Sequence, residues 1–469
     1  MVRLIVFLLL TSVTVEILAE SPASPSLPEA EEAFETKPFE TVVPQLPRQK
    51  FLTEQLADGL RLSSADESFK YHIGGNIQVD SVSYLSPSSA FSLPNGTVSG
   101  IGGADATFLR RARIRIDGTF YAQFDYMLEY DFANANNENN GLQPPSFGNI
   151  AISPAPTNVW MQVRDVPVFG SLRAGNQVKP VGFTSQVYQG FLPFLERADI
   201  YDAFFAGFDN GFSIGVSARD HSDDERVTWQ YGIYRPLTNA FGIALNKVAW
   251  GGRVTALPVY ENEGERLVHI GFGTFNGNLP ENQLRDRARP LLRNGPGYAN
   301  PILVDTGNVA GRYQYTLAPE FAAVYGPWTV QSEWTGQFLN KAVVNGAPQG
   351  TVFYQGAYVE VLRFLTGETQ FYDRETGAFG RVTPKANFRS SRDEIQGSGA
   401  WQVALRLGYL DLNNKAVQGG TVYNSTLGVN WFLNPHMKVQ LNYVLENRAQ
   451  PGTPTVWING IGMRVACDF

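Results

Sequence analysis

The sequence of 469 residues is poor in the side chains that most often build disulfides and metal sites. It contains one cysteine, Cys467, and four histidines that lie far apart. A disulfide framework and a cysteine-based metal site are therefore excluded, and no pair of histidines has the spacing of zinc ligands. We accordingly expect no metal and no other cofactor.

The chain also lacks a surplus of positive charge. It has 44 acidic residues against 37 basic ones, which gives a formal charge of −7. Nucleic-acid-binding proteins show the opposite balance, so nucleic acid is not an expected partner. Lysine is scarce as well, because 28 of the basic residues are arginine and only 9 are lysine.

Long hydrophobic runs are missing except at the N-terminus. Met1–Ala19 combines Arg3 with an apolar run and a small residue before Glu20, as in a secretory signal peptide. No other stretch of 18 apolar residues occurs, so we expect no membrane-spanning helix. With 13% aromatic and 17% charged residues, the composition indicates an exported β protein.

Residues 20–70 differ from the rest of the chain in composition. They hold six prolines and ten acidic against five basic residues, which is typical of a disordered spacer or tether. An alternative for part of it is a short amphipathic helix over Gln49–Leu62, where leucines recur at helical spacing. The spacer accounts for −5 of the formal charge, so residues 71–469 are close to neutral.

From Tyr71 onward, alternation of apolar and polar side chains predicts sixteen β-strands. They are expected at 71–84, 107–117, 121–132, 157–165, 169–177, 211–218, 227–235, 247–257, 265–276, 309–325, 327–339, 352–364, 398–411, 421–433, 436–448 and 456–469. Long connections largely alternate with tight turns, which we expect at Asp117–Gly118, Val166–Pro167, Gly326–Pro327 and Asn434–Pro435. Such alternation is typical of transmembrane β-barrels, with long loops at one mouth and tight turns at the other.

The last strand shows how the two faces are expected to differ. One face has apolar side chains at Trp457, Ile461, Val465 and Phe469, and the other has Arg464. An apolar face suits lipid, whereas a polar face suits a water-filled lumen. The sequence therefore predicts an all-β fold, a transmembrane antiparallel β-barrel of about 16 strands.

The strand at 107–117 contains a row of arginines. Period two places Arg111, Arg113 and Arg115 on one face and Arg110 on the other, near the end of the strand. We expect the row to face the lumen, because arginine at the middle of the lipid face costs about 2–4 kcal/mol. Carboxylates of the strand at 121–132 offer an alternative role for Arg113 and Arg115 as a structural wall network, which leaves Arg111 more accessible to solute.

A second group of arginines lies in the long connection at 277–308. Arg285, Arg287 and Arg289 alternate along the chain, and Arg293 follows. The guanidinium group is a permanently charged fork that suits phosphate and carboxylate oxygens. The alternative is an ordinary solvated loop.

Several sequence blocks, in one order, resemble the phosphate-selective porin O and P family over about residues 71–469. The blocks are Leu109–Arg113, Gly175–Phe183, Phe194–Ala198, Gly252–Pro258, Arg266–Gly271, the arginines 285, 287 and 289 before Pro290, Asp305–Gly307, Ala323–Pro327, Gly377–Val382 and Tyr409–Leu412.

The resemblance implies a trimeric outer-membrane barrel in which the connection at 178–210 folds inward and narrows the pore. It implies an arginine ladder that includes Arg110, Arg111, Arg285, Arg287 and Arg289. It also implies that Lys179, and Arg381 and Lys385 in the turn at 365–397, lie near the constriction or the inner mouth. The partners that the resemblance implies are small anions such as phosphate, outer-membrane lipid and further copies of the chain.

The residues leave more than one function open. We favour passive diffusion of small anions through the barrel, phosphate or polyphosphate first. A general or sugar-selective porin with weak ion preference is the alternative if the arginines are paired with wall carboxylates. A structural tether acting through residues 20–70 is a further possibility. An enzyme is not expected, because Gly211–Gly215 matches a serine nucleophile motif but begins an alternating strand with no helix after it.

Overall fold

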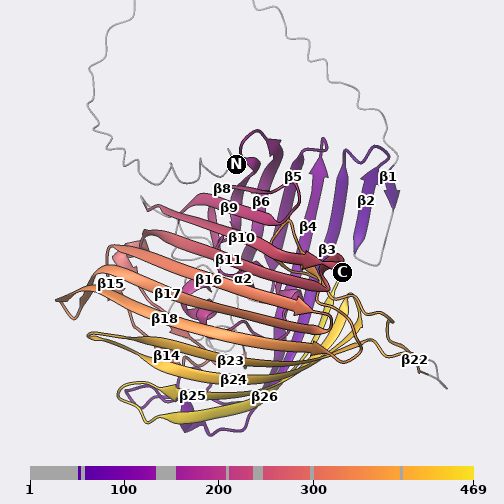
Figure 1. Cartoon of the computed structure of the whole chain (residues 1–469). Helices are drawn as coiled ribbons and strands as arrows, with labels where there is room; N and C mark the ends of the chain where they lie inside the picture. Colours follow the sequence, from indigo (N-terminus) through magenta and orange to yellow (C-terminus); the bar gives the residue numbers. More distant parts are fainter. Residues whose placement is uncertain are drawn as a thin grey trace, which may run out of the picture. The chain divides into compact units, whose positions relative to one another are not determined.

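Sixteen antiparallel strands close into a barrel, as the sequence predicts (Figure 1). The computed structural model describes residues 51–53, 59–133, 155–206, 211–235, 247–295, 300–390 and 395–469. The predicted signal peptide and most of the predicted spacer lie outside these residues. Residues 51–469 form one unit, and only this unit is described.

Each barrel strand pairs with the next along the chain, and the last pairs with the first. The strands are β3 (Lys70–Tyr84), β4 (Ala106–Phe120), β5 (Phe124–Asp131), β6 (Ala155–Val166), β7 (Gly170–Val178), β8 (Phe212–His221), β9 (Val227–Arg235), β10 (Ala249–Glu261), β11 (Arg266–Asn278), β16 (Tyr313–Tyr325), β17 (Trp328–Val344), β18 (Ala347–Phe364), β23 (Ala400–Asn414), β24 (Val417–Asn434), β25 (Met437–Ala449) and β26 (Val456–Asp468). Every predicted strand coincides with one of them.

Outside the barrel strands, the described residues form only short elements. The short strands are β1 (Phe51–Thr53), β2 (Leu60–Ser64), β12 (Gln283–Leu284), β13 (Arg287–Ala288), β14 (Val304–Asp305), β15 (Val309–Ala310), β19 (Tyr372–Asp373), β20 (Ala378–Phe379), β21 (Arg389–Ser390) and β22 (Ile395–Gly397). The helical turns are η1 (Ser88–Phe91), α2 (Phe183–Gln186), η2 (Gln189–Phe191), η3 (Tyr201–Ala206), η4 (Asn262–Gly264) and η5 (Pro280–Asn282). Within the described ranges, no helix has the length and apolar character needed to cross a membrane.

Three of the four expected tight turns are confirmed, and one is wrong. Val166–Pro167, Gly326–Pro327 and Asn434–Pro435 each lie where one strand ends and the next begins. Asp117–Gly118 instead lies inside β4, and the chain reverses beyond Phe120. The glycine serves strand packing there, because a Cβ atom on Gly118 would lie 2.0 Å from the carbonyl oxygen of Lys70 on β3.

The alternative of a helix over Gln49–Leu62 is wrong for the residues of this segment that the structure describes, because β1 and β2 are extended. β2 pairs antiparallel with the first residues of β3, where Leu60 lies opposite Ile73. β26 reaches only as far as Asn76 on the same edge of β3. The start of β3 therefore offers backbone groups that no barrel strand can pair, and β2 satisfies them.

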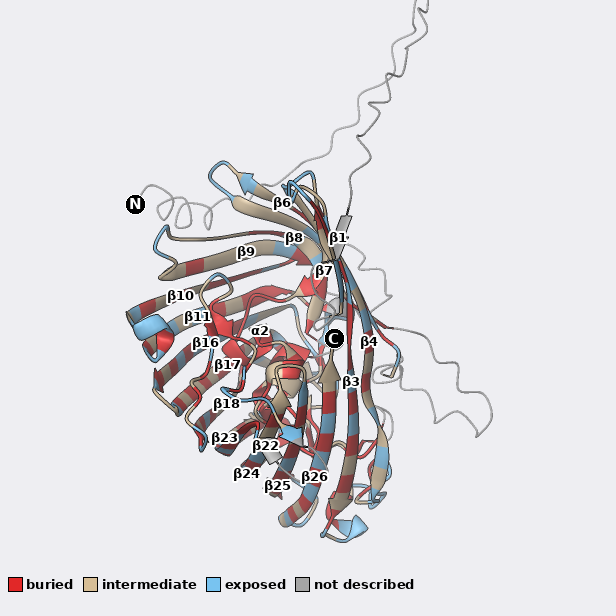
Figure 2. Cartoon of the chain, turned by 90° about the vertical axis from the view of Figure 1, so that its right-hand side faces the viewer, coloured by how far each residue is buried: buried red, intermediate tan, exposed pale blue. Residues whose placement is uncertain are grey.

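Side chains alternate between the outer face and the lumen along the barrel strands. Figure 2 shows the resulting stripes of buried and exposed residues. In β26, Ile461, Met463 and Val465 are 41–45% exposed, whereas Arg464 is 0% exposed. The predicted division of the last strand is therefore confirmed, and the polar side chains of the barrel lie inside it.

An ion pair joins the two strands at which the barrel closes. The guanidinium of Arg464 on β26 donates to both carboxylate oxygens of Asp80 on β3, at 2.6 and 2.7 Å. Both side chains are almost completely buried, so the Asp80 carboxylate depends on Arg464 for compensation of its charge, and Arg464 also lies 3.3 Å from Glu196.

We predict that Arg464→Met strongly destabilises the closed barrel. The substitution leaves the Asp80 carboxylate buried without its partner, which costs about 3–5 kcal/mol. The measurement is the temperature at which the detergent-folded protein loses its compact electrophoretic mobility. A double variant, Arg464→Met with Asp80→Leu, should recover most of this temperature, and equal instability of both variants would contradict the ion pair's role.

Candidate functional site: a constriction cavity

The described part of the connection between β7 and β8, residues 179–206, lies inside the barrel and is called the constriction loop below (Figure 1). It contains α2, η2 and η3. Most of its described residues are buried, although they belong to no barrel strand (Figure 2). The loop therefore fills part of the lumen that a simple cylinder would leave to water.

The start of the constriction loop is held by a carboxylate of the barrel wall. Glu333 on β17 accepts the backbone N–H groups of Phe183 at 2.5 Å and of Thr184 at 3.0 Å. Gly182, just before them, has φ of 74°. A Cβ atom at this position would lie 2.5 Å from the ring of Phe205. The turn into the lumen therefore requires glycine both for its conformation and for its close packing.

The middle of the loop is held further round the barrel wall. Asn430 on β24 donates to the carbonyl oxygen of Pro193 at 2.8 Å. The backbone N–H of Leu195 donates to the side-chain oxygen of Asn442 on β25 at 2.8 Å. The path of the loop is therefore fixed by hydrogen bonds to β17 and to β24 and β25, which lie three and four strands beyond β17 in the barrel.

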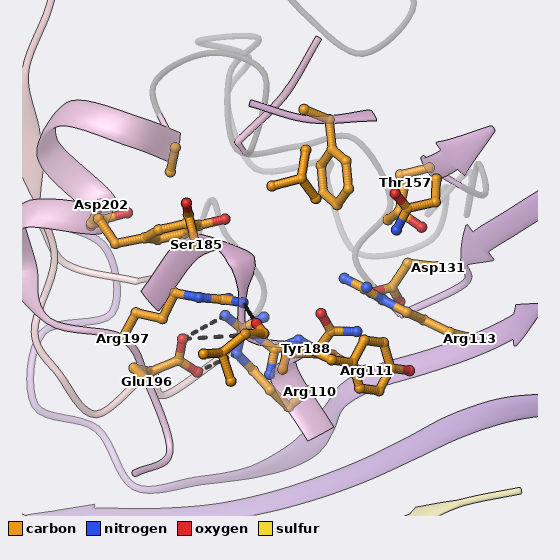
Figure 3. A pocket seen from close by; sticks show the side chains of 18 of the residues that line it. Arg110, Arg111, Arg113, Asp131, Thr157, Ser185, Tyr188, Glu196, Arg197 and Asp202 are labelled. Carbon is orange, nitrogen blue, oxygen red and sulfur yellow. Dashed lines mark hydrogen bonds and ion pairs between the residues drawn. The ribbon is translucent and has the colours of Figure 1, made fainter. Parts of the chain in front are cut away.

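A β-bulge turns Arg110 into the lumen. In the pairing of β3 with β4, Gln78 lies opposite Arg111 but Val79 lies opposite Leu109, so Arg110 is an extra residue. Strict alternation places Arg110 on the face opposite Arg111, and this is wrong because a bulge shifts the alternation by one residue. The position of Arg110 in the lumen agrees with the placement that the family resemblance implies. Its guanidinium donates to both oxygens of Glu196 in the constriction loop, at 2.7 and 2.9 Å (Figure 3).

Arg111 also faces the lumen, and it has partners there. It donates to the side-chain oxygen of Gln78 at 2.6 Å and lies 3.9 Å from Glu196. Arg111 is 5% exposed, so it is less open to solute than the sequence indicates. Burial alone would raise the pKa of Glu196, but the guanidiniums of Arg110, Arg111 and Arg464 outweigh it and hold that pKa well below its ordinary value.

The other two arginines of β4 belong to wall networks. Arg113 lies 3.2 Å from Glu129 and 2.9 Å from Asp131, both on β5. The alternative of pairing with the next strand is thus confirmed for Arg113. Arg115 instead binds Asp117 of its own strand at 2.8 Å.

These residues surround a cavity of ≈ 210 Å³ beside the constriction loop, called the constriction cavity (Figure 3). Five guanidinium groups and three carboxylates line it. The cations are Arg110, Arg111, Arg113, Arg197 and Arg293, and the anions are Asp131, Glu196 and Asp202. The lining therefore has more positive than negative charges, and it suits an anion of small size.

Arg197 is a lining residue that the sequence analysis missed. Its guanidinium donates to the carbonyl oxygens of Thr184 at 2.8 Å and Val187 at 2.6 Å, and it lies over the ring of Tyr201. Within the described residues, no carboxylate oxygen comes within 4.0 Å of it. Burial lowers the pKa of Arg197 from its ordinary value. The block Phe194–Ala198 was the only sequence signal for this position, because the loop has no alternation.

Of the second arginine group, only Arg293 lines the constriction cavity. Asp202 of the constriction loop lies 3.1 Å from Arg293 and 3.4 Å from Arg289. Arg285 donates to Asp305 at 2.9 Å within its own connection. These contacts fix the connection between β11 and β16 onto the constriction loop.

The remaining predicted cations lie away from this cavity. Arg287 is half-buried in β13, and Lys179 is buried with its ammonium 5.3 Å from the centre of a phenylalanine ring. Arg381 donates to a backbone carbonyl in the turn between β24 and β25 at 2.7 Å. Lys385 is exposed and donates to a backbone carbonyl at 2.5 Å. None of the four is among the residues that line the constriction cavity.

A wider cavity of ≈ 720 Å³, called the inner vestibule, opens at the mouth with the tight turns. Its walls come from the ends of β4 to β8 near those turns, whereas the constriction cavity uses the opposite halves of the same strands. Glu375 and Thr376, from the connection between β18 and β23, form another side. Arg253 on β10 holds that connection by donating to the carbonyl oxygen of Gly377 at 2.7 Å.

Comparison with known proteins gives one consistent match. The sequence profile of the family described as "Phosphate-selective porin O and P" matches residues 94–469. Porin O of Pseudomonas aeruginosa is 24% identical over 434 residues, which cover 82% of this chain and 85% of that protein. Solved structures that match include an anion-selective porin from Comamonas acidovorans (11% identity, TM-score 0.47, covering 86% of this chain and 100% of that one). The outer membrane channel DcaP of Acinetobacter baumannii also matches (9% identity, TM-score 0.49, covering 87% and 99%).

We predict that Gly182→Ala changes the single-channel conductance, because the added methyl group displaces the start of the constriction loop from Phe205 and Glu333. Gly346→Ala is the matched control. Gly346 has φ of 78°, close to that of Gly182, but no atom lies within 4 Å of a Cβ placed there. Both variants should lose about 1 kcal/mol from backbone strain. Equal conductance in the two variants would contradict the packing role of Gly182.

Proposed function

The chain belongs to the phosphate-selective porin O and P family and is an outer-membrane porin, and on that premise we propose that its channel favours small anions, phosphate first. As a channel protein it is not an enzyme. The observation that supports anion preference is the lining of the constriction cavity, where five guanidiniums face three carboxylates. Diffusion through it is passive and needs no cofactor.

The proposed mechanism depends on partial compensation of the arginines. An anion that enters the constriction cavity exchanges part of its hydration shell for guanidinium donors. Arg110 and Arg111 lie 2.7 and 3.9 Å from the carboxylate of Glu196, and the five guanidiniums that line the cavity outnumber its three carboxylates. The carboxylates nearby keep binding weak enough for the anion to leave. In this proposal Arg110, Arg111, Arg113, Arg197 and Arg293 form the part of the arginine ladder at the constriction.

The assembly and export of the chain complete the proposal. We infer a homotrimer in the outer membrane, with lipid against the apolar outer face of the strands. Export would use Met1–Ala19 as a signal peptide, and residues 20–50 would act as a spacer. The composition of these segments supports the last two inferences.

A general porin with weak ion preference is the second candidate. The ion pairs of Arg113 with Glu129 and Asp131 favour it, because paired arginines contribute little net charge to the lumen. This candidate predicts that chloride and potassium permeate almost equally, and that millimolar phosphate leaves the current unchanged.

We predict that reversal potentials in a potassium chloride gradient across a planar bilayer show anion preference. Arg111→Gln should lower the chloride-to-potassium permeability ratio by about a factor of two to five, because it removes one of the surplus positive charges at the constriction. Arg363→Gln is the control, since Arg363 is exposed and stacks on Trp328 away from the constriction cavity. Cation preference, or an unchanged ratio in Arg111→Gln, would exclude the proposed selectivity.

A further inference from the structure

Four arginines line the inner vestibule: Arg61, Arg164, Arg173 on β7 and Arg219 on β8. None of the four lines the constriction cavity. In the pairing of β7 with β8, Arg173 lies opposite Ser217 and Arg219 lies opposite Ser171. Arg173 and Arg219 are therefore diagonal neighbours on adjacent strands, close enough for one ligand to bind both.

The carboxylates of the vestibule are bound elsewhere or lie farther away. Three are paired with other cations: Glu67 with Lys70 at 2.9 Å, Asp117 with Arg115 at 2.8 Å and Asp125 with Arg164 at 3.2 Å. The other three that line the vestibule are Asp165, Asp220 and Glu375. In the part of the chain that the structure describes, no carboxylate oxygen lies within 4.0 Å of Arg173 or Arg219.

An aromatic side chain of β6 holds Arg173 in a defined position. The central carbon of its guanidinium lies 3.7 Å from the centre of the Trp160 ring system. Its Nε donates to the side-chain oxygen of Gln162 at 3.1 Å. A guanidinium that stacks on an indole ring remains charged. Its Nη–H donors lie in the guanidinium plane, parallel to the ring, and point away from the stack toward a ligand. Met127, opposite Trp160 on β5, adds apolar surface to the same vestibule.

We propose that Trp160, Arg173 and Arg219 form a binding site for aromatic carboxylates at the inner vestibule. The carboxylate binds the guanidinium donors of Arg173 and Arg219, and the planar ring packs on the Trp160–Arg173 stack beside Met127. Inorganic phosphate and acetate offer oxygens for the arginines but no ring for the stack. The vestibule volume of ≈ 720 Å³ leaves room for such an anion to enter and leave.

The inference rests on the proposed function only because it requires a conducting barrel. It names a substrate class that the constriction cavity does not define, since that cavity is smaller and its lining, among the described residues, offers no tryptophan on which an aromatic ring could stack. Organic anions would therefore bind at one place on the path and inorganic anions at another.

The test measures the block of potassium chloride current by benzoate added to both sides of a planar bilayer. We expect benzoate to halve the current at a concentration about tenfold lower than acetate or phosphate does. Trp160→Leu should raise that concentration for benzoate about five- to tenfold and leave the acetate value unchanged. Trp160→Phe, which keeps a ring, should restore part of the benzoate block.

Trp328→Leu is the matched control, because Trp328 stacks with Arg363 at 4.8 Å but does not line the vestibule. The proposal is overturned if benzoate blocks no better than acetate, or if Trp160→Leu and Trp328→Leu change the block equally. Reversal potentials of the same variants separate the two proposals. Benzoate block without anion preference would overturn the proposed selectivity and leave this site intact, and the opposite result would overturn this site alone.

Discussion

The ion pairs of the Glu196 carboxylate are the interactions on which the arrangement of the barrel interior depends. The carboxylate lies 2.7 Å from Arg110, 3.3 Å from Arg464 and 3.9 Å from Arg111. Buried guanidiniums without a counter-charge would be costly, and a loop across the lumen needs fixed points on the wall. One residue meets both needs, since it joins the constriction loop to β4 and to the seam strand β26 while compensating several cations at once.

That arrangement also determines how strongly the channel can act on an anion. A lumen lined by fully paired arginines would have almost no preference, and one lined by isolated arginines would hold the anion too tightly to conduct it. Arg113 is paired with two carboxylates, whereas Arg197 donates to backbone carbonyls and has no carboxylate oxygen within 4.0 Å among the described residues. The compensation of charge therefore differs between the guanidiniums that line the constriction cavity.

The strands could be predicted from the sequence because two-residue alternation is a local property that every barrel strand obeys. The constriction could be predicted only in part. Arg110 was placed on the wrong face because a bulge inserts one residue, and nothing in the strand itself marks it. Arg197 was missed because loop residues have no period, and their positions depend on hydrogen bonds to distant strands such as that from Asn430. Which arginines are paired is likewise a property of the folded barrel.

The two cavities both use the strands β4 to β8, at opposite ends of these strands. Along β4, Arg111 lines one cavity and Asp117 the other, a separation of six residues or about 20 Å. The constriction loop and the connection held by Arg253 occupy other parts of the lumen. In the proposed function, an anion meets arginines of the constriction cavity and arginines of the inner vestibule in succession on one wall. Successive weak sites favour conduction over retention, because no single site holds the anion strongly.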